Sequence, residues 1–241
     1  MSRPAERPKR TRRTVLAIGG GLVAVAVVAF VAVYFLLFPT SSPKPLSLVT
    51  STAATPVSPG TQLAGRWTIA PGSVAGYRVR EKLGFLPAES DAVGRTSAIT
   101  GEATFTEAKG VVTAKAASFV VAVNTLKSDR AMRDEHIHTI GLQSDRYPKA
   151  TFVLSSPVTL PRSALTGHVI SVSATGVFTV HGTSRRETVP LQMSLSDSAI
   201  DAAGSLTFPW SEFNMTAPSV GGFVNVTNHA TMEFDLHLQR A

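Results

Sequence analysis

The stretch from Val123 to Phe152 reads VNTLKSDRAMRDEHIHTIGLQSDRYPKATF, and it interrupts the pattern of the surrounding chain. On both sides, apolar and β-branched residues alternate with polar ones, which is typical of β-strands. Between Ser128 and His138 the alternation disappears, and seven of these eleven residues are charged or His. Ser128 is a suitable N-cap, and Gly141 can end a helix. We therefore predict a short helical crossover that joins two strands.

Strands with one buried face account for most of the sequence after Gly65. In the last of them, polar residues alternate with five apolar ones: Ala230, Met232, Phe234, Leu236 and Leu238. His168 to Val180 repeats the pattern, and Gly176 within it predicts a bend or bulge. Further strands are predicted near residues 67–70, 76–83, 97–107, 111–123, 150–160, 187–197 and 199–208. Hairpins or tight bends are predicted at Lys109-Gly110, His181-Gly182 and Ala203-Gly204.

About nine strands with one helical excursion predict an all-β fold that closes into an antiparallel barrel, because an open sheet of that length would expose its edges. Barrels of about eight strands are either filled by side chains or just wide enough for one slender ligand. Several residues that we predict to point inward are small: Ala103, Ala116, Ala122, Ala174, Gly176, Ala202 and Ala230. They favour an incompletely filled interior, whereas the alternative is that loops and the crossover helix plug it. Alternation predicts the following wall residues: Phe105, Phe119, Phe152, Phe178, Met232 and Phe234.

Three short blocks carry a resemblance to known proteins. They are RDEHI at 133–137, YPKATF at 147–152 and VHGT at 180–183. Together they resemble the signature of the YceI-like family of lipid-binding proteins, and the resemblance covers roughly Gly65 to the C-terminus. It implies an extended, lipocalin-like antiparallel β-barrel that holds an isoprenoid chain in its interior.

A charged cluster lies in the predicted crossover helix and consists of Arg130, Arg133, Asp134 and His136. The i,i+4 spacing would pair Arg130 with Asp134, a contact worth only about 0.3–0.5 kcal/mol if it is exposed. One interpretation is that the cluster only fastens the helix over the barrel. The other, by analogy with the family, is that it closes the mouth of the pocket and offers hydrogen-bond donors to a ligand head group.

The positive charge of the chain is concentrated near its N-terminus. Residues 1–64 hold seven of the 23 Lys and Arg and one of the 16 acidic residues, which leaves 16 basic and 15 acidic residues for 65–241. The folded part is therefore nearly neutral, which argues against a nucleic-acid partner despite the net charge of +7. Because the sequence contains no cysteine, it has neither disulfides nor a lipoprotein anchor.

Residues 15–38 form an uncharged run of 24 residues that follows a basic tail at 1–14. At about 1.5 Å per residue, such a helix is long enough to cross a hydrocarbon core of ~30 Å. Six cations precede the run and none follows before Lys44, so the positive-inside rule places the N-terminus in the cytoplasm. We expect a single-pass anchor in a bacterial cell membrane. A cleaved signal peptide is the alternative, although the run is long for one.

Residues 39–64 contain five Pro and ten Ser or Thr. A segment of this composition buries too little apolar surface to offset the entropy of ordering it. We therefore predict a linker that tethers a barrel domain at 65–241 to the outer face of the membrane, within the bacterial cell envelope.

Catalytic and metal-binding patterns are weak in this sequence. A Gly-x-Ser-x-Gly nucleophile elbow is absent. On a helix, His136 and His138 would point about 200° apart and would not share a metal ion. We therefore predict no enzymatic activity, no metal and no cofactor.

The sequence as a whole predicts a membrane-tethered, extracytoplasmic barrel that binds an isoprenoid or quinone-like lipid non-covalently. The alternative function is a structural or interaction module of the cell envelope whose barrel is packed solid. Whether the barrel forms a homodimer is left open by the sequence.

Overall fold

The structure is a computed structural model that describes residues 28–29, 42–48, 56–83, 89–220 and 224–241. Met1–Ser42 and Pro43–Ala241 are separate compact units. Apart from Val28 and Ala29, the predicted membrane span at 15–38 lies outside the described residues. Within the described part of the chain, no helix combines the length and the apolar character that a membrane crossing requires.

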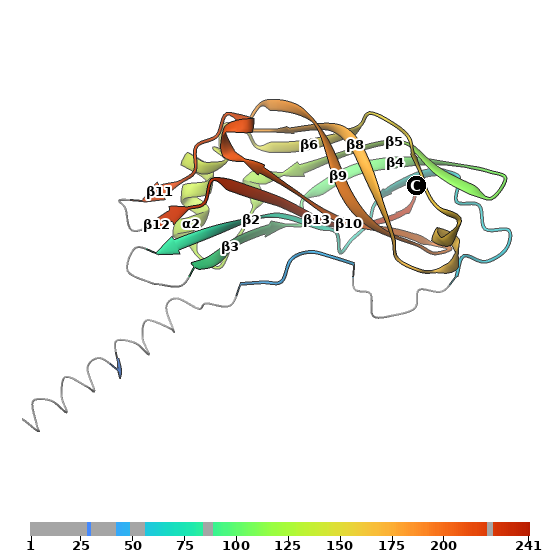
Figure 1. Cartoon of the computed structure of the whole chain (residues 1–241), viewed down its shortest axis with the longest axis horizontal. Helices are drawn as coiled ribbons and strands as arrows, with labels where there is room; N and C mark the ends of the chain where they lie inside the picture. The colour runs from blue at the N-terminus through green and yellow to red at the C-terminus, as the bar shows by residue number, and fades with distance from the viewer. Residues whose placement is uncertain (1–27, 30–41, 49–55, 84–88, 221–223) are drawn as a thin grey trace, which may run out of the picture. The chain divides into compact units, whose positions relative to one another are not determined.

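The second unit, Pro43–Ala241, is an all-β antiparallel barrel (Figure 1), as the alternating pattern predicted. Eight strands form the closed path β1-β4-β5-β6-β8-β9-β10-β13, and the pairing of β1 with β13 closes it. The described strands are β1 (Gly65–Ile69), β2 (Val74–Leu83), β3 (Glu89–Thr96), β4 (Ile99–Ala108), β5 (Val111–Ala122), β6 (Lys149–Leu154), β7 (Val158–Thr159), β8 (Ile170–Val180), β9 (Thr183–Leu195), β10 (Ala199–Pro209), β11 (Ser219–Val220), β12 (Val224–Val226) and β13 (His229–Arg240).

Three strands were not predicted. β3 pairs with β2 over eight residues, although its sequence ESDAVGRT shows little apolar alternation. β11 and β12 are only two and three residues long, which is too short for a periodic pattern. The strand predicted at 150–160 is divided, because β6 pairs with β5 and β8, whereas β7 pairs with β5 alone.

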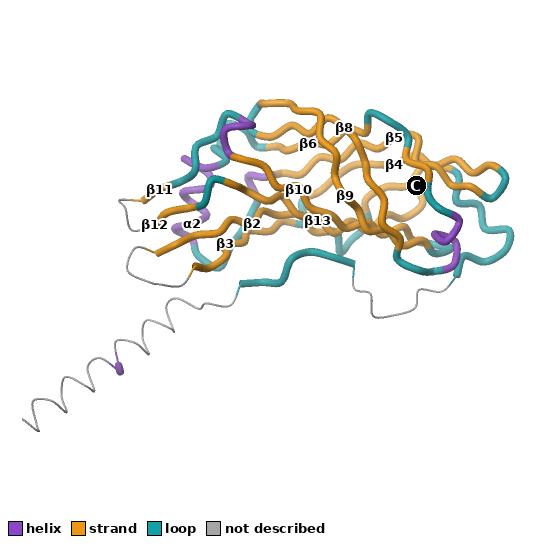
Figure 2. The backbone as a smooth tube through the Cα atoms, viewed as in Figure 1, coloured by secondary structure: helices purple, strands orange, loops and turns teal. Residues whose placement is uncertain are grey.

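The predicted crossover joins β5 to β6 at one end of the barrel (Figure 2). It consists of α2 (Ala131–His136) and a π-helical turn, Ile137–Gly141. Its start differs from the prediction, because Arg130 and not Ser128 is the N-cap residue. The Ser128 hydroxyl instead accepts a hydrogen bond from the backbone N–H of Arg130, at 3.2 Å.

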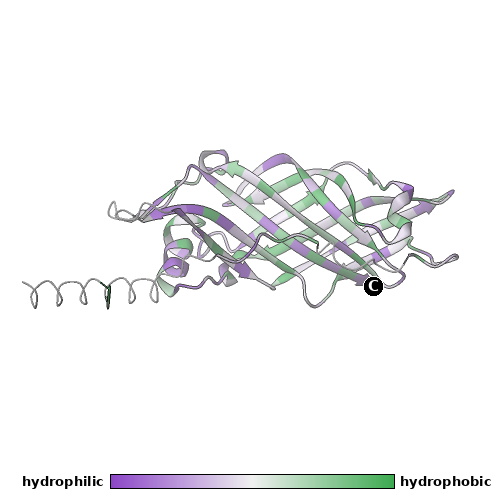
Figure 3. Ribbon diagram, turned by 60° about the horizontal axis from the view of Figure 1, so that its bottom comes forward, coloured by the Kyte–Doolittle hydropathy of each residue, from purple (hydrophilic) through white to green (hydrophobic). Residues whose placement is uncertain are grey.

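Hydrophobic and polar residues alternate along the barrel strands (Figure 3), but a β-bulge shifts the alternation in β5. Thr104 lies opposite Ala116 and Phe105 lies opposite Ala114, so Lys115 is the extra residue. The prediction that Ala116 points inward is therefore wrong, since its side chain is exposed. Ala122 is also only partly buried and lies outside the cavity lining described below.

The turn predictions are partly confirmed. Lys109-Gly110 and His181-Gly182 form turns, and all four residues have positive φ angles between 51° and 70°. Ala203-Gly204 is not a turn but lies inside β10, and the chain turns between Leu195 and Ala199 instead. Gly176 causes neither bend nor bulge, because β8 and β9 pair in one register throughout.

Two core clusters occupy opposite ends of the barrel. The first, beneath α2, includes Tyr77, Leu126, Ile137, Leu142 and Phe213, each at most 6% exposed. The second, at the end where the β4–β5 hairpin and η3 (Arg162–Thr166) lie, has a group of side chains that are at most 2% exposed: Leu63, Trp67, Phe105, Leu160, Leu195 and Ile200.

Parts of the predicted linker contact the barrel. The Arg78 guanidinium donates to the carbonyl of Pro43 at 2.7 Å, and the Arg95 guanidinium donates to the carbonyl of Lys44. Further along, Asp197 accepts hydrogen bonds from the backbone N–H and the hydroxyl of Ser58. These described segments are therefore fastened to the barrel, whereas composition alone predicted a free tether.

Candidate functional site

An internal cavity of about 150 Å³ lies between the two core clusters. Seven of the eight strands of the closed barrel path contribute to its wall, and nearly all of the lining is apolar. The predicted small residues Ala103, Ala174 and Ala202 are part of that lining, together with Ala114 and Ala117 from the bulged strand. Small side chains on facing strands therefore leave the interior incompletely filled.

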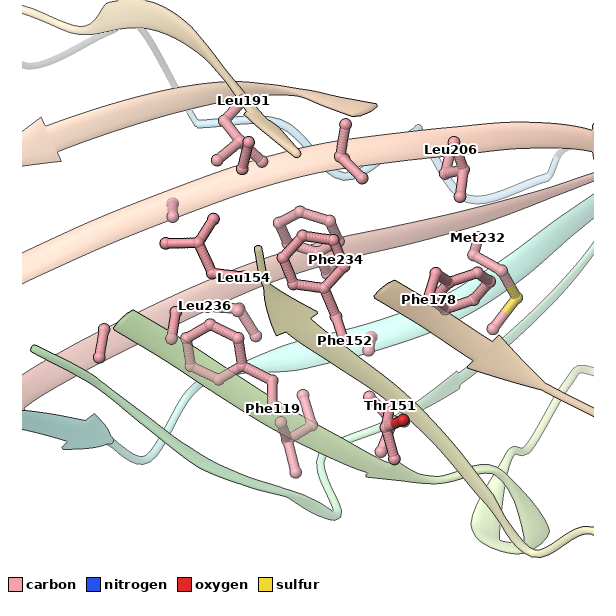
Figure 4. Close-up of a pocket in the computed structure, with 18 of the residues that line it drawn as sticks. Phe119, Thr151, Phe152, Leu154, Phe178, Leu191, Leu206, Met232, Phe234 and Leu236 are labelled. Atoms are coloured by element: carbon pink, nitrogen blue, oxygen red, sulfur yellow. The ribbon is translucent and has the colours of Figure 1, made fainter. Parts of the chain in front are cut away.

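All six predicted wall residues line this cavity: Phe105, Phe119, Phe152, Phe178, Met232 and Phe234. Figure 4 shows the rings of Phe119, Phe152 and Phe234 reaching from separate strands into one shared space. Leu191, Leu206 and Leu236 also line it and were not among the predicted wall residues, although Leu236 was already placed on the apolar face of the last strand. Their alternation within β9, β10 and β13 could have identified them.

Glycines on neighbouring strands provide room for three of these rings. A Cβ atom added at Gly101 would come within 2.7 Å of the Phe119 ring, and one added at Gly204 within 2.9 Å of the Phe234 ring. One added at Gly176 would come within 2.4 Å of the Phe152 ring. Each contact is shorter than real Cβ atoms tolerate, so the rings lie against bare backbone along the wall.

The cavity is suited to apolar molecules, and its lining residues do not form a catalytic arrangement. An apolar cavity of roughly this size stays dry and accepts a molecule about the size of benzene, so a longer chain must displace lining side chains to fit. The one ionisable residue in the lining, Glu233, directs its carboxylate to the outer face, where it accepts hydrogen bonds from Arg95 at 3.1 Å and Arg78 at 3.3 Å. Binding inside must therefore rest on burial of apolar surface.

The four residues predicted at the pocket mouth do not line this cavity. The Arg133 guanidinium binds the Glu81 carboxylate at 2.7 Å and also Asp129. Burial opposes the charge of Arg133, but Glu81 and Asp129 together raise its pKa. The Asp134 carboxylate accepts the N–H of Ser128 at 2.8 Å.

The other two members of that cluster also have local partners. Nδ1 of His136 lies 2.7 Å from the carbonyl oxygen of Met132, one turn earlier. Arg130 forms an ion pair with Asp129 at 3.6 Å. The contact of Arg133 with Glu81 on β2 supports the interpretation that the cluster fastens the crossover over the first core cluster.

No metal centre is evident in the described part of the chain, where no three His, Cys, Asp or Glu side chains gather. Nδ1 of His138 interacts with the Ser144 hydroxyl, away from His136. Nδ1 of His181 lies 3.2 Å from the carbonyl oxygen of Phe213, and its Nε2 lies 3.2 Å from the amide oxygen of Gln143. Each of these histidines therefore has a structural partner, and that of His181 lies in η4 (Trp210–Phe213).

Comparisons with solved structures concern the fold of this chain. A polyisoprenoid-binding domain from Saccharophagus degradans superimposes with a TM-score of 0.54 at 13% identity, covering 74% of this chain and 99% of that one. BcnA from Burkholderia cenocepacia gives 0.49 at 21% identity, covering 68% and 95%. The YceI protein of Campylobacter jejuni gives 0.49 at 13% identity, covering 61% and 84%. The first of these likenesses supports the barrel fold.

The comparison with protein-family models addresses the sequence resemblance directly. A search of curated proteins gave no match. The model of the YceI-like domain, however, matches residues 67–238, which is the greater part of the chain and nearly all of the barrel. The chain therefore belongs to the YceI-like family.

Proposed function

We propose that this barrel binds an isoprenoid or similar linear lipid non-covalently in its interior cavity. The observation that carries the proposal is the unfilled apolar space lined by Phe119, Phe152 and Phe234, whose rings lie close against glycines. The family match supports it, as does the polyisoprenoid-binding description of the similar Saccharophagus domain.

Burial of the hydrocarbon chain supplies the affinity in this mechanism. Each methylene group moved out of water contributes about 0.8 kcal/mol, so a long chain needs few polar contacts. The branched, unsaturated units of an isoprenoid fit a wall that alternates aromatic rings with alanines. No reacting group is needed, and we propose a binding protein, not an enzyme.

The tether and the cellular location are part of the same proposal. The predicted span at 15–38 would anchor the chain, and the barrel would lie on the extracytoplasmic side, where such a lipid can pass between membrane and protein. A reporter fusion before residue 15 and another after residue 241 test this orientation. Activity of a cytoplasm-specific reporter at the C-terminal fusion would contradict it.

Titration of residues 43–241 with geranylgeraniol, followed by native mass spectrometry, tests the binding directly. Pro43–Ala241 is a compact unit with its own closed barrel and core, so it can be studied without the anchor. The proposal predicts a saturable complex of one lipid per barrel. A barrel that stays empty at saturating lipid would favour the alternative, a packed interaction module.

A further inference from the structure

Among the described residues, neither end of the barrel offers a path to the cavity. Core side chains fill both ends, among them Leu126 and Phe213 beneath α2, and Trp67, Leu195 and Ile200 at the other end, all at most 2% exposed. A lipid that entered along the barrel axis would have to displace one of these clusters. Removing buried side chains of this size from their contacts costs several kcal/mol each, so an axial path is unfavourable.

One seam of the barrel wall is open over part of its length. β9 and β10 pair at only five positions, Leu191–Leu195 against Ile200–Gly204. The other edge of β9 pairs with β8 from Thr183 to Met193, and the other edge of β10 pairs with β13 along all of its residues. Among the described strands, none pairs with the facing edges of 183–190 and 205–209.

Pro190 explains why the pairing stops. A Cβ atom at Gly204 would lie 2.6 Å from the Pro190 carbonyl oxygen, so that carbonyl points toward β10. In a strand, the N and the carbonyl of one residue face the same neighbour, and the nitrogen of proline has no hydrogen to donate. The ladder therefore ends at Leu191, and the two strands separate beyond it.

The separated edges border the cavity. Val189 of β9 and Leu206 of β10 both line it, and the inward-facing Leu206 is only partly buried. The opening is bounded at its far end by the Asn214 amide, which donates to the Thr183 hydroxyl at 3.0 Å. Glu187 and Glu212 interact across the same seam, where β9 meets η4.

Backbone pairing is also missing between β7 and β8, but side chains fill this second seam. β7 pairs with β5 and not with β8, which leaves Ile170–Ala174 without a partner on that side among the described strands. Buried Leu160 and Ala164, at 2% and 1% exposure, belong to the same core cluster as Ile170. Buried Val189 and Phe208, at 5% and 2% exposure, also lie along the seam between β9 and β10. Leu206 of that seam, however, lines the cavity and is only partly buried, so this seam is the better opening.

We propose that the lipid enters and leaves the cavity sideways, through the seam between residues 183–190 of β9 and 205–209 of β10. This inference rests on the proposed lipid binding. The lateral path also agrees with the predicted tether. Leu46 and Ser47 belong to the predicted linker, and they line a surface groove together with Pro190 and Ser205 of the two seam strands. Only four residues separate Phe38 from Pro43, so an extended chain between them spans at most about 18 Å.

A bridge across the seam tests the proposal, and the absence of native cysteine makes the chemistry specific. Continuing the register of Leu191 with Gly204 places Thr188 opposite Thr207, and both side chains are exposed. The double variant Thr188→Cys/Thr207→Cys would be closed by oxidation, or by a short bismaleimide if the sulfur atoms do not meet. The control is Thr175→Cys/Thr188→Cys, which joins strands already paired, with hydroxyls 2.9 Å apart.

The readout is the rate at which residues 43–241 take up geranylgeraniol. We expect the seam bridge to slow uptake at least about tenfold, reduction of the disulfide to restore the rate, and the control bridge to change nothing. Equal rates in the bridged and reduced seam variant would overturn the lateral path while leaving the lipid-binding proposal intact. Failure of the reduced and the unmodified proteins to take up lipid would overturn both.

Discussion

The Phe152 ring lies directly over Gly176 on the neighbouring strand, so that a Cβ atom at position 176 would come within 2.4 Å of the Cζ atom of the ring. The same atom would lie 2.5 Å from the backbone oxygen of Val153, which cannot move aside. This arrangement sets the position of the ring against the wall. It therefore controls how much of the interior remains open.

Gly176→Ala should force the Phe152 ring away from the wall and into the cavity. Overpacking of this kind costs typically 1–3 kcal/mol, and we expect about 2 kcal/mol less stability in urea unfolding. Lipid uptake should fall as well, because the displaced ring occupies the binding space. The double variant with Phe152→Leu should recover part of both losses, and strictly additive effects would show that the two residues are not coupled.

Ala117→Leu should block the cavity without unfolding the barrel. Ala117 lines the interior, and the added carbons would occupy space that the proposed lipid needs. Losing burial of about two methylene groups corresponds to roughly tenfold weaker binding. The matched control is Ala116→Leu, one residue earlier and exposed beyond the bulge. Equal lipid affinity of the two variants would contradict the assignment of the site.

Arg133→Met should destabilise the barrel and leave lipid affinity unchanged. The substitution leaves the Glu81 carboxylate, 7% exposed, without its 2.7 Å partner, and breaking a buried pair in this way costs about 3 kcal/mol. Adding Glu81→Gln should recover much of the unfolding free energy. A stable Arg133→Met barrel with weakened lipid binding would instead support the head-group role that the family analogy suggested.

Glu187 should make stability fall with rising pH. Burial, the neighbouring Glu212 carboxylate and their hydrogen bond raise the pKa of Glu187. Because the pKa of Glu187 is raised in the folded state, its contribution to stability is full below the unfolded value of about 4.3 and is lost as pH rises through the folded value. Glu187→Gln should therefore match the parent near pH 4 and exceed its Tm by about 1–3 °C at pH 7. A Tm difference independent of pH would refute this electrostatic account of the pair.

Much of the fold follows from alternation because one buried face imposes a period of two on each strand. That rule identified the closed barrel and five of the wall residues, namely Phe105, Phe152, Phe178, Met232 and Phe234, and its interruption identified the crossover. Phe119 also lines the cavity, but strict alternation in β5 would not place it on the same face as Ala116. The rule failed at Ala116, since the bulge at Lys115 changes the side on which later residues of β5 lie. It also missed β3, because its buried residues Ala92 and Val93 are consecutive and do not alternate with polar ones.

The charged cluster shows a different limit of sequence reasoning. Helical spacing places Arg130 and Asp134 on one face, but Arg133 binds Glu81, which is 52 residues earlier on β2. Similarly, nothing local to Ala203-Gly204 distinguishes a turn from a strand position where a bulky ring crosses the glycine. Such contacts between distant segments decide the role of each residue, and a single sequence does not contain them.

The most direct test of interior lipid binding is mass spectrometry of the organic extract from residues 43–241, purified from a bacterial host and washed free of detergent. The account predicts an isoprenoid or quinone-like species at about one molecule per barrel in the parent protein, and much less in Ala117→Leu than in Ala116→Leu. Equal or absent lipid in all three proteins, together with no uptake of added geranylgeraniol, would contradict it.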